Sequence, residues 1–261
     1  MRMIILAAGQ GTRLRPLTDT QPKCLVPVHG RPLLDWQIAS ARQAGIDDIV
    51  VVRGYLKDAI NRPDITVVDN PRYDSTNMVS TLWCATSFFD EEFIVSYGDI
   101  IYEPRIIEAL LADPSPIGVV VDTGWRAYWE RRFDSVLEDA ETLVLSPDGC
   151  IMDIGKKPAS VEQIHAQYIG LTAYRKNGVD ALRDAYDSAR AHEAAGQHAF
   201  SGNRPLSQLY MTDLIQGIID SGFPVRHVPV HRGWLEIDSP TDLEIAEQCA
   251  VHNNGRLEIT S

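Results

Sequence analysis

The sequence predicts an α/β fold: a Rossmann-like, doubly wound mixed sheet with helices on both faces. Two observations support this prediction. Strand-like and helix-like segments alternate through the first half of the chain. The strand-like segments are apolar almost throughout, which is typical of strands that are buried on both faces. Sheets of this kind bind ligands at the carboxyl ends of their strands, so polar residues at those positions are the first candidates for a functional site.

The expected elements follow from the spacing of apolar residues. Strands are predicted at 3–8, 47–54, 65–70, 91–99, 117–124 and 223–230. Helices are predicted at 31–45, 75–89, 177–195, 205–221 and 239–248. A hairpin is predicted over 143–155, and residues 253–261 are expected to form a loose tail.

Local signals set several of these boundaries. Gly45 is a typical stop signal for the first helix, and Ser75 or Thr76 is the expected N-cap of the second. Ser239 followed by Pro240 is a typical start for the last helix, and Asp148-Gly149 is the expected hairpin turn.

The composition excludes some classes of function. The net charge of −12 over 261 residues disfavours nucleic acid and anionic membrane as partners, so we expect neither. The four cysteines lack metal-ligand spacing, and the N-terminus reads as a strand rather than a signal peptide. These features predict a cytoplasmic protein. On so acidic a chain, the few basic clusters are informative about phosphate binding.

The strongest motif follows the first strand, where Gly9 and Gly11 precede Arg13 and Pro22 precedes Lys23. Glycines let backbone N–H groups approach phosphates, and the two cations supply the charge that a triphosphate requires. The spacing differs from a P-loop, and Leu14 stands where a dinucleotide fingerprint has its third glycine. The motif therefore predicts a triphosphate-binding loop of another kind.

This run resembles the signature of the sugar-nucleotidyltransferase superfamily, and the resemblance covers most of the chain. It implies the nucleotidyltransferase fold and a loop that wraps an NTP. In that family the arginine contacts the leaving pyrophosphate and the lysine neutralises the reacting phosphates, which implies catalytic roles for Arg13 and Lys23. The implied nucleotide-binding residues in the loop are Leu6, Ala7, Ala8, Gly9, Gly11, Thr12, Arg13 and Lys23.

Two aspartates at strand ends are the candidate metal ligands. Asp99 follows Gly98 at the end of an apolar strand, and Asp238 precedes the last helix. Either aspartate could simply cap the next element. The family resemblance implies instead that both hold Mg²⁺, a cation that prefers carboxylates together with substrate phosphates. Gly98 is expected to permit close approach of the nucleotide.

The segment from Thr76 to Leu82 bears on the base. Taken alone it reads as a helix N-terminus, but it resembles the base-side segment of cytidylyltransferases for non-sugar acceptors, such as phosphocholine and phosphonate enzymes. Asn77 and Ser80 would supply polar groups to a pyrimidine edge. The resemblance therefore favours CTP over UTP, GTP or dTTP.

The acceptor side is predicted downstream. Trp125 and Trp129 precede an acidic stretch, and a lysine pair follows it. This region resembles the corresponding part of enzymes that activate phosphoglutamine or phosphonates with CTP. Tryptophan faces could pack a cationic acceptor, and an acidic residue among Glu138, Asp139 and Glu141 could pair with its ammonium; the same residues could also be core and surface. Lys156 is the first choice for a catalytic lysine at the acceptor phosphate. The expected acceptor-binding residues are Trp125, Trp129, Glu138, Asp139, Lys156, Lys157 and Tyr168.

The combined prediction is a magnesium-dependent cytidylyltransferase that transfers CMP from CTP to a small, non-sugar phosphate or phosphonate and releases pyrophosphate. Another NTP could replace CTP as the nucleotide donor. A sugar-1-phosphate nucleotidyltransferase and an inactive nucleotide-sensing domain are the alternatives. Because the sequence shows no internal repeat and no low-complexity linker, we expect a single domain over residues 1–261. It is expected to comprise an NTP-binding half (1–123), an acceptor-binding half (124–238) and a C-terminal helix and tail (239–261). A homo-oligomer is compatible with the sequence.

Overall fold

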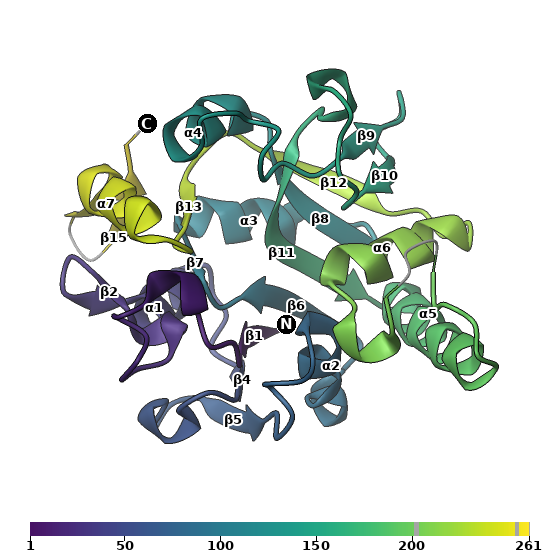
Figure 1. Ribbon diagram of the computed structural model, residues 1–261, viewed down its shortest axis with the longest axis horizontal. Coiled ribbons are helices and arrows are strands. Elements are labelled where there is room, and N and C mark those ends of the chain that lie inside the picture. Colours follow the sequence, from purple (N-terminus) through teal and green to yellow (C-terminus); the bar gives the residue numbers. More distant parts are fainter. Residues whose placement is uncertain (201–203, 254–255, 261) are drawn as a thin grey trace.

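The computed structural model describes residues 1–200, 204–253 and 256–260. Its central sheet has seven strands in the order β12-β8-β11-β6-β1-β4-β5 (Figure 1). The strand β11 runs antiparallel to its neighbours β6 and β8, whereas all other neighbouring strands of this central sheet are parallel. The predicted mixed, doubly wound sheet is confirmed. The strands are β1 (Arg2–Ala7), β4 (Ile49–Arg53), β5 (Thr66–Asp69), β6 (Glu92–Tyr97), β8 (Ile117–Asp122), β11 (Gln167–Arg175) and β12 (Arg226–Val230).

Helices cover both faces of this sheet. In β1, Met3 and Ile5 belong to one buried cluster and Ile4 and Leu6 to the other, as the alternation of a strand requires. The first cluster includes side chains from α1 (Leu33–Gln43), α3 (Pro104–Ala112), α4 (Trp125–Arg132) and α7 (Pro240–Cys249). The second includes side chains from α2 (Met78–Trp83), α5 (Asn177–Ala194) and α6 (Met211–Asp220).

Smaller elements complete the described part of the chain. Two-stranded sheets join β2 (Pro27–Val28) to β3 (Arg31–Pro32), β7 (Ile100–Tyr102) to β13 (Trp234–Glu236), β9 (Leu143–Leu145) to β10 (Ile151–Ile154), and β14 (Ala250–Asn253) to β15 (Arg256–Ile259). Short 3-10 turns are η1 (Thr12–Leu14), η2 (Lys23–Leu25), η3 (Lys57–Ala59), η4 (Thr86–Phe88), η5 (Val161–Gln163) and η6 (Leu206–Gln208).

The structure differs from the sequence prediction at several points. The second helix is capped by Asn77, whose side chain accepts a hydrogen bond from the Met78 N–H, rather than by Ser75 or Thr76. The expected loose tail is wrong for 256–259, because β15 pairs with β14 and buries Leu257; residues 254–255 and 261 lie outside the described part. The helices α3 and α4 and the strand β11 were not predicted.

The sheet brings particular segments to one edge. Leu6 pairs with Tyr97, so the carboxyl ends of β1 and β6 lie side by side. Because β11 is reversed, its beginning lies at that same edge, with Leu171 opposite Ser96. The pairing register of β11 with β8 shifts between Tyr168 and Thr172, and irregularities of this kind often re-aim side chains near active sites.

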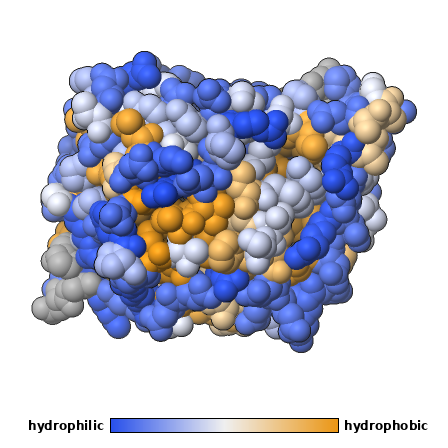
Figure 2. Space-filling model, turned by 90° about the horizontal axis from the view of Figure 1, so that it is seen from below, coloured by the Kyte–Doolittle hydropathy of each residue, from blue (hydrophilic) through white to orange (hydrophobic). Residues whose placement is uncertain are grey.

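The face of the molecule around β5 and α2 has a mixed surface. These elements lie on the lower side of the view in Figure 1, and from below apolar residues gather in a hollow bordered by polar ones (Figure 2). No helix in the described residues is long and apolar enough to cross a membrane.

Candidate active site

The glycine-rich loop after β1 is packed against the segment that carries Lys23. Gly11 has a φ of +62°, and a Cβ atom there would lie 2.8 Å from the Cβ of Lys23. Any other residue at this position would therefore meet both backbone strain and a clash. The loop and Lys23 are thus fixed in a close mutual arrangement before any ligand binds.

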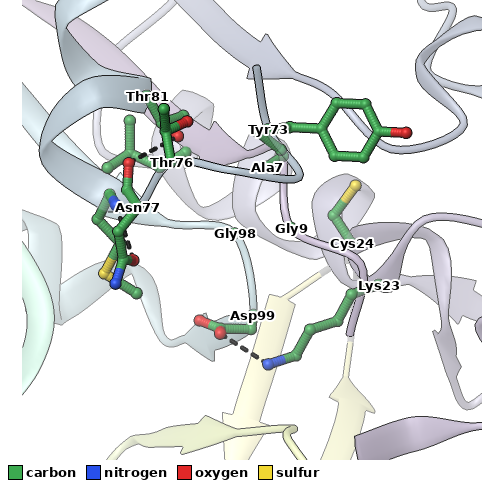
Figure 3. A pocket seen from close by; sticks show the side chains of 13 residues that line it. Ala7, Gly9, Lys23, Cys24, Tyr73, Thr76, Asn77, Thr81, Gly98 and Asp99 are labelled. Carbon is green, nitrogen blue, oxygen red and sulfur yellow. Dashed lines mark hydrogen bonds and ion pairs between the residues drawn. The ribbon is translucent and has the colours of Figure 1, made fainter. Parts of the chain in front are cut away.

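A cluster of four charged side chains lies beside this loop. The Lys23 ammonium donates a hydrogen bond to Asp99 Oδ2 at 2.7 Å (Figure 3). It also contacts Asp238. Arg13, whose side chain is largely exposed, contacts the other oxygen of Asp238. The two predicted cations and the two predicted metal ligands, distant in sequence, therefore meet at one place.

Backbone pairing explains why the two aspartates converge. Asp99 follows β6, and Asp238 follows β13, which pairs with β7. The Ile237 N–H donates to the Asp99 carbonyl at 2.9 Å. A Cβ at Gly98 would lie 2.6 Å from the Leu6 carbonyl oxygen, so the adjoining strand by itself requires glycine here. Gly98 also lines the cavity beside the glycine loop, and its contact with a nucleotide stays a prediction.

The aspartate pair fits a divalent cation. Asp99 Oδ1 is buried and has no hydrogen-bond partner among the described residues, and such an oxygen is costly to leave unsatisfied. No group of three or more His, Cys, Asp or Glu side chains in the described part could hold a metal. Two carboxylates at one point match Mg²⁺, which takes its remaining ligands from phosphates and water.

A cavity of about 140 Å³ lies between the loop and α2, on the side where the nucleotide is predicted to bind (Figure 3). Several predicted residues line it: Leu6, Ala7, Ala8, Gly9, Lys23, Asn77, Gly98 and Asp99. Gly11 and Thr12 lie in the adjoining turn and do not line it. Thr76, Met78 and Thr81 from the predicted base-side segment also line this cavity, although only Asn77 and Ser80 of that segment were predicted as binding residues. Cys24 and Tyr73 line it as well and were not predicted.

Ser80 points away from the cavity. Its hydroxyl lies 3.5 Å from the Ser207 carbonyl oxygen, on the η6 side of α2. Asn77 sits at the helix start, and its carboxamide oxygen already accepts from Met78 N–H at 2.8 Å. Its Nδ2 donates only a long bond of 3.4 Å to the Gln208 carbonyl, so the amide N–H groups are the part of Asn77 most available to a base.

A second cavity, of about 290 Å³, adjoins the charged cluster on the side where the acceptor is predicted to bind. Its lining combines aromatic rings with carboxylates, and Met78 lines both cavities. Asp139, Trp129 and Tyr168 were predicted here, and Arg13 lies on this side of the cluster. The other aromatic and acidic lining residues are Tyr97, Tyr210, Trp234, Glu141, Glu236 and Asp238.

Several predicted acceptor residues lie elsewhere. Trp125 is 4% exposed and packs in the core with its ring edge-on to Trp129. Glu138 is exposed and does not line the cavity. Lys156 pairs with Asp153, and Lys157 donates to backbone carbonyls of Leu137 and Glu138; both lysines line a separate depression. The turn after β10 thus directs this basic pair away from the reacting centre.

Two acidic side chains in this second cavity have pKa values that are raised mainly by burial. Burial raises the pKa of Glu141 to about 7, and the neighbouring carboxylates Asp139, Asp213 and Glu236 add to the effect. Burial also raises the pKa of Glu236, although Arg132 opposes this. The Arg132 guanidinium is 2.7 Å from Glu236 Oε2 and 2.7 Å from Asp242 Oδ1, and it lies over the Trp129 ring.

Arg132 also connects this second cavity to the turn that carries Asp238. Asp242, its second partner, accepts hydrogen bonds from the N–H groups of Asp238 and Ser239 at 3.1 and 2.9 Å. Asp242 therefore caps α7 and fixes the backbone of Asp238 at the same time.

Comparisons with known proteins agree with this geometry. The sequence profile of the MobA-like NTP transferase domain matches residues 3–198. The CTP:phosphoglutamine cytidylyltransferase of Campylobacter jejuni is 36% identical over 256 residues, which cover 94% of this chain and 98% of that protein. The glucose-1-phosphate thymidylyltransferase of Streptomyces griseus is 26% identical over 263 residues, 93% of this chain and 64% of that protein.

A solved structure shows the same fold. The CTP:phosphocholine cytidylyltransferase of Streptococcus pneumoniae superposes with a TM-score of 0.71 at 24% identity, over 95% of this chain and 97% of that one.

The fold, the glycine loop and the converging charges define a nucleotidyltransferase. The chain belongs to the family of MobA-like NTP transferase domains.

Proposed function

We propose that this enzyme transfers CMP from CTP to a small, non-sugar phosphate or phosphonate and releases pyrophosphate, with Mg²⁺ as its cofactor. The observation that carries the proposal is the position of the cluster formed by Arg13, Lys23, Asp99 and Asp238. It lies between a cavity beside the glycine loop and a second, acidic and aromatic cavity. Two substrates bound in these cavities would meet at the cluster.

The chain's own groups act by positioning and by charge. An oxygen of the acceptor phosphate attacks the α-phosphorus, and because this oxygen is already anionic, no side-chain base is required. Lys23 and Arg13 exchange their carboxylate partners for phosphate oxygens and stabilise the charge that moves onto pyrophosphate. Asp99 and Asp238, released from these ion pairs, would hold Mg²⁺, which supplies further positive charge to the phosphates.

The choice of CTP and of a non-sugar acceptor has separate support. The relative from Campylobacter jejuni, similar over 94% of this chain, is a CTP:phosphoglutamine cytidylyltransferase. The acceptor cavity adds a physical reason, since it presents the carboxylates Asp139, Glu141 and Glu236 beside aromatic rings. A neutral hexose has no group that matches so much negative charge, whereas an acceptor with an amino group does.

The test is pyrophosphate release by the purified enzyme with each of four NTPs and a panel of acceptors. The panel contains phosphocholine, 2-aminoethylphosphonate, phosphoglutamine and hexose-1-phosphates. We expect turnover to require a divalent metal and to be fastest with CTP and a non-sugar acceptor. If UTP or dTTP with a hexose-1-phosphate reacts at least tenfold better, the sugar nucleotidyltransferase alternative replaces this proposal. Absence of pyrophosphate release with all pairs would favour a nucleotide-sensing role.

A further inference from the structure

The side chain of Glu141 is unusual among the acids of the acceptor cavity. Its backbone is held on both sides by Gln167, which accepts from the Glu141 N–H at 3.2 Å and donates to the Glu141 carbonyl at 2.7 Å. Its side chain lines the cavity and is partly buried. Within the described residues this carboxylate makes no ion pair or hydrogen bond, so its backbone is held in place while its oxygens are open to a ligand in the cavity.

The other charged groups around this carboxylate do not neutralise it. Glu236 has Arg132 as a partner at 2.7 Å, and Arg204 is engaged by both oxygens of Asp213, at 2.9 and 3.2 Å. Asp139 and Asp213 add negative charge nearby. A partly buried carboxylate among other carboxylates is held at some cost in free energy, and groups of this kind are concentrated at functional sites. A cationic ligand in the cavity would supply the positive charge that the surrounding side chains do not.

The shape and lining of the cavity indicate where that positive charge belongs. Arg13 and Asp238, which contact each other in the charged cluster, also line this cavity, and the proposed function places the acceptor phosphate beside them. Aromatic rings form the walls, with Tyr97 and Tyr168 edge-on at 5.6 Å between centroids. Such walls suit a short methylene chain and favour a nearby cation.

We propose that Glu141 selects acceptors that carry a protonated amine at the end opposite the phosphate. The inference rests on the proposed function, because it assigns the second cavity to the acceptor. Glu141 is a specificity residue here: it contacts the remote amine and takes no part in the transfer itself. A quaternary ammonium or a hydroxyl would match it less well, since neither donates N–H groups to a carboxylate.

A dependence on pH follows from this role. The bound amine requires an ionised Glu141, so acceptor affinity should increase as the pH rises from 6 to 8. The groups that face Glu141 or act on its charge are Asp139, Asp213, Glu236, Arg204, Arg13 and Asp238. Glu141→Gln keeps the shape and removes the charge, and should abolish this part of the dependence.

The experiment compares 2-aminoethyl phosphate with ethyl phosphate, which lacks only the amine. The dissociation constant of each probe is measured by calorimetry for the wild type, for Glu141→Gln and for the control Glu108→Gln. Glu108 is an exposed acid on α3. Turnover with CTP and Mg²⁺ is measured in parallel. We expect the wild type and the control to prefer the amino probe at least tenfold at pH 8 and Glu141→Gln to lose most of this preference. The KM for CTP should stay within about twofold.

The outcomes separate the two proposals. An undiminished preference for the amino probe in Glu141→Gln, or no preference in the wild type, would overturn the role of Glu141. Loss of preference in binding supports that role even if no NTP gives turnover, and the lack of turnover then counts against the proposed function alone. Circular dichroism checks that each variant is folded.

Discussion

The unpaired carboxylate of Glu141 has a consequence for stability that does not depend on any substrate. Its pKa rises from an ordinary 4.5 to about 7 in the folded protein. Between these values the folded state holds a proton that the unfolded state has released, so the group favours the unfolded state increasingly as the pH rises. At about 1.4 kcal/mol per pKa unit, the difference amounts to about 3 kcal/mol above pH 7.

The perturbation that tests this is Glu141→Gln, which resembles the protonated acid at every pH. We expect the variant and the wild type to unfold at similar urea concentrations at pH 4.5. At pH 8 the variant should be more stable, by at most about 3 kcal/mol. The measurement is urea unfolding followed by circular dichroism at half-unit steps of pH.

The exposed Glu108→Gln is the control, and its free energy of unfolding should stay within about 0.5 kcal/mol of the wild type at all pH values. A gain for Glu141→Gln that is the same at pH 4.5 and pH 8 would refute the electrostatic reasoning. A loss of stability at pH 8 would show that the carboxylate has a stabilising partner.

Three further predictions concern the charged network. Lys23→Ala should lower kcat by about 10²-fold or more while the fold survives, because a cation at the reacting phosphates is lost; near wild-type turnover at saturating NTP would contradict this. Asp99→Asn and Asp238→Asn should each abolish metal-dependent turnover, and a retained rate with unchanged metal dependence would identify that aspartate as a capping residue. Arg132→Gln should cost about 3–5 kcal/mol of stability, because it leaves buried carboxylates unpaired. Arg126→Gln, which removes an exposed pair on the same helix, should cost under about 1 kcal/mol, and equal losses in the two variants would contradict the special role of Arg132.

Much of the nucleotide side was predictable because its signals are local. The apolar runs at β1 and β6 predict buried strands, and the polar residues directly after them must lie at the ligand-binding edge. The convergence of Asp99 with Asp238 required the family resemblance, since β7 and β13 are too short to be recognised from their pattern.

The acceptor side was less predictable, because it depends on which way each side chain points. Trp125 and Trp129 are four residues apart on α4, yet only Trp129 reaches the cavity. Lys156 and Lys157 form a basic pair in the sequence, but Lys156 pairs with the carboxylate of Asp153 and Lys157 donates to the backbone carbonyl of Glu138. Glu141 was one of three acids considered for the amine, and burial, which the sequence does not reveal, distinguishes it from Glu138.

The reversed direction of β11 divides the site between two kinds of chain segment. The triphosphate side is built where parallel strands end, whereas Gln167, Tyr168 and Gly170 reach the acceptor cavity at the beginning of a strand. Residues 167–170 and the acids Asp139 and Glu141 line that cavity and lie apart in the sequence from the glycine loop. Exchanges at these positions could therefore reshape the second cavity while the glycine loop and Lys23 stay unchanged. Such a plan would let one scaffold change its second substrate without change to the loop proposed to hold the first.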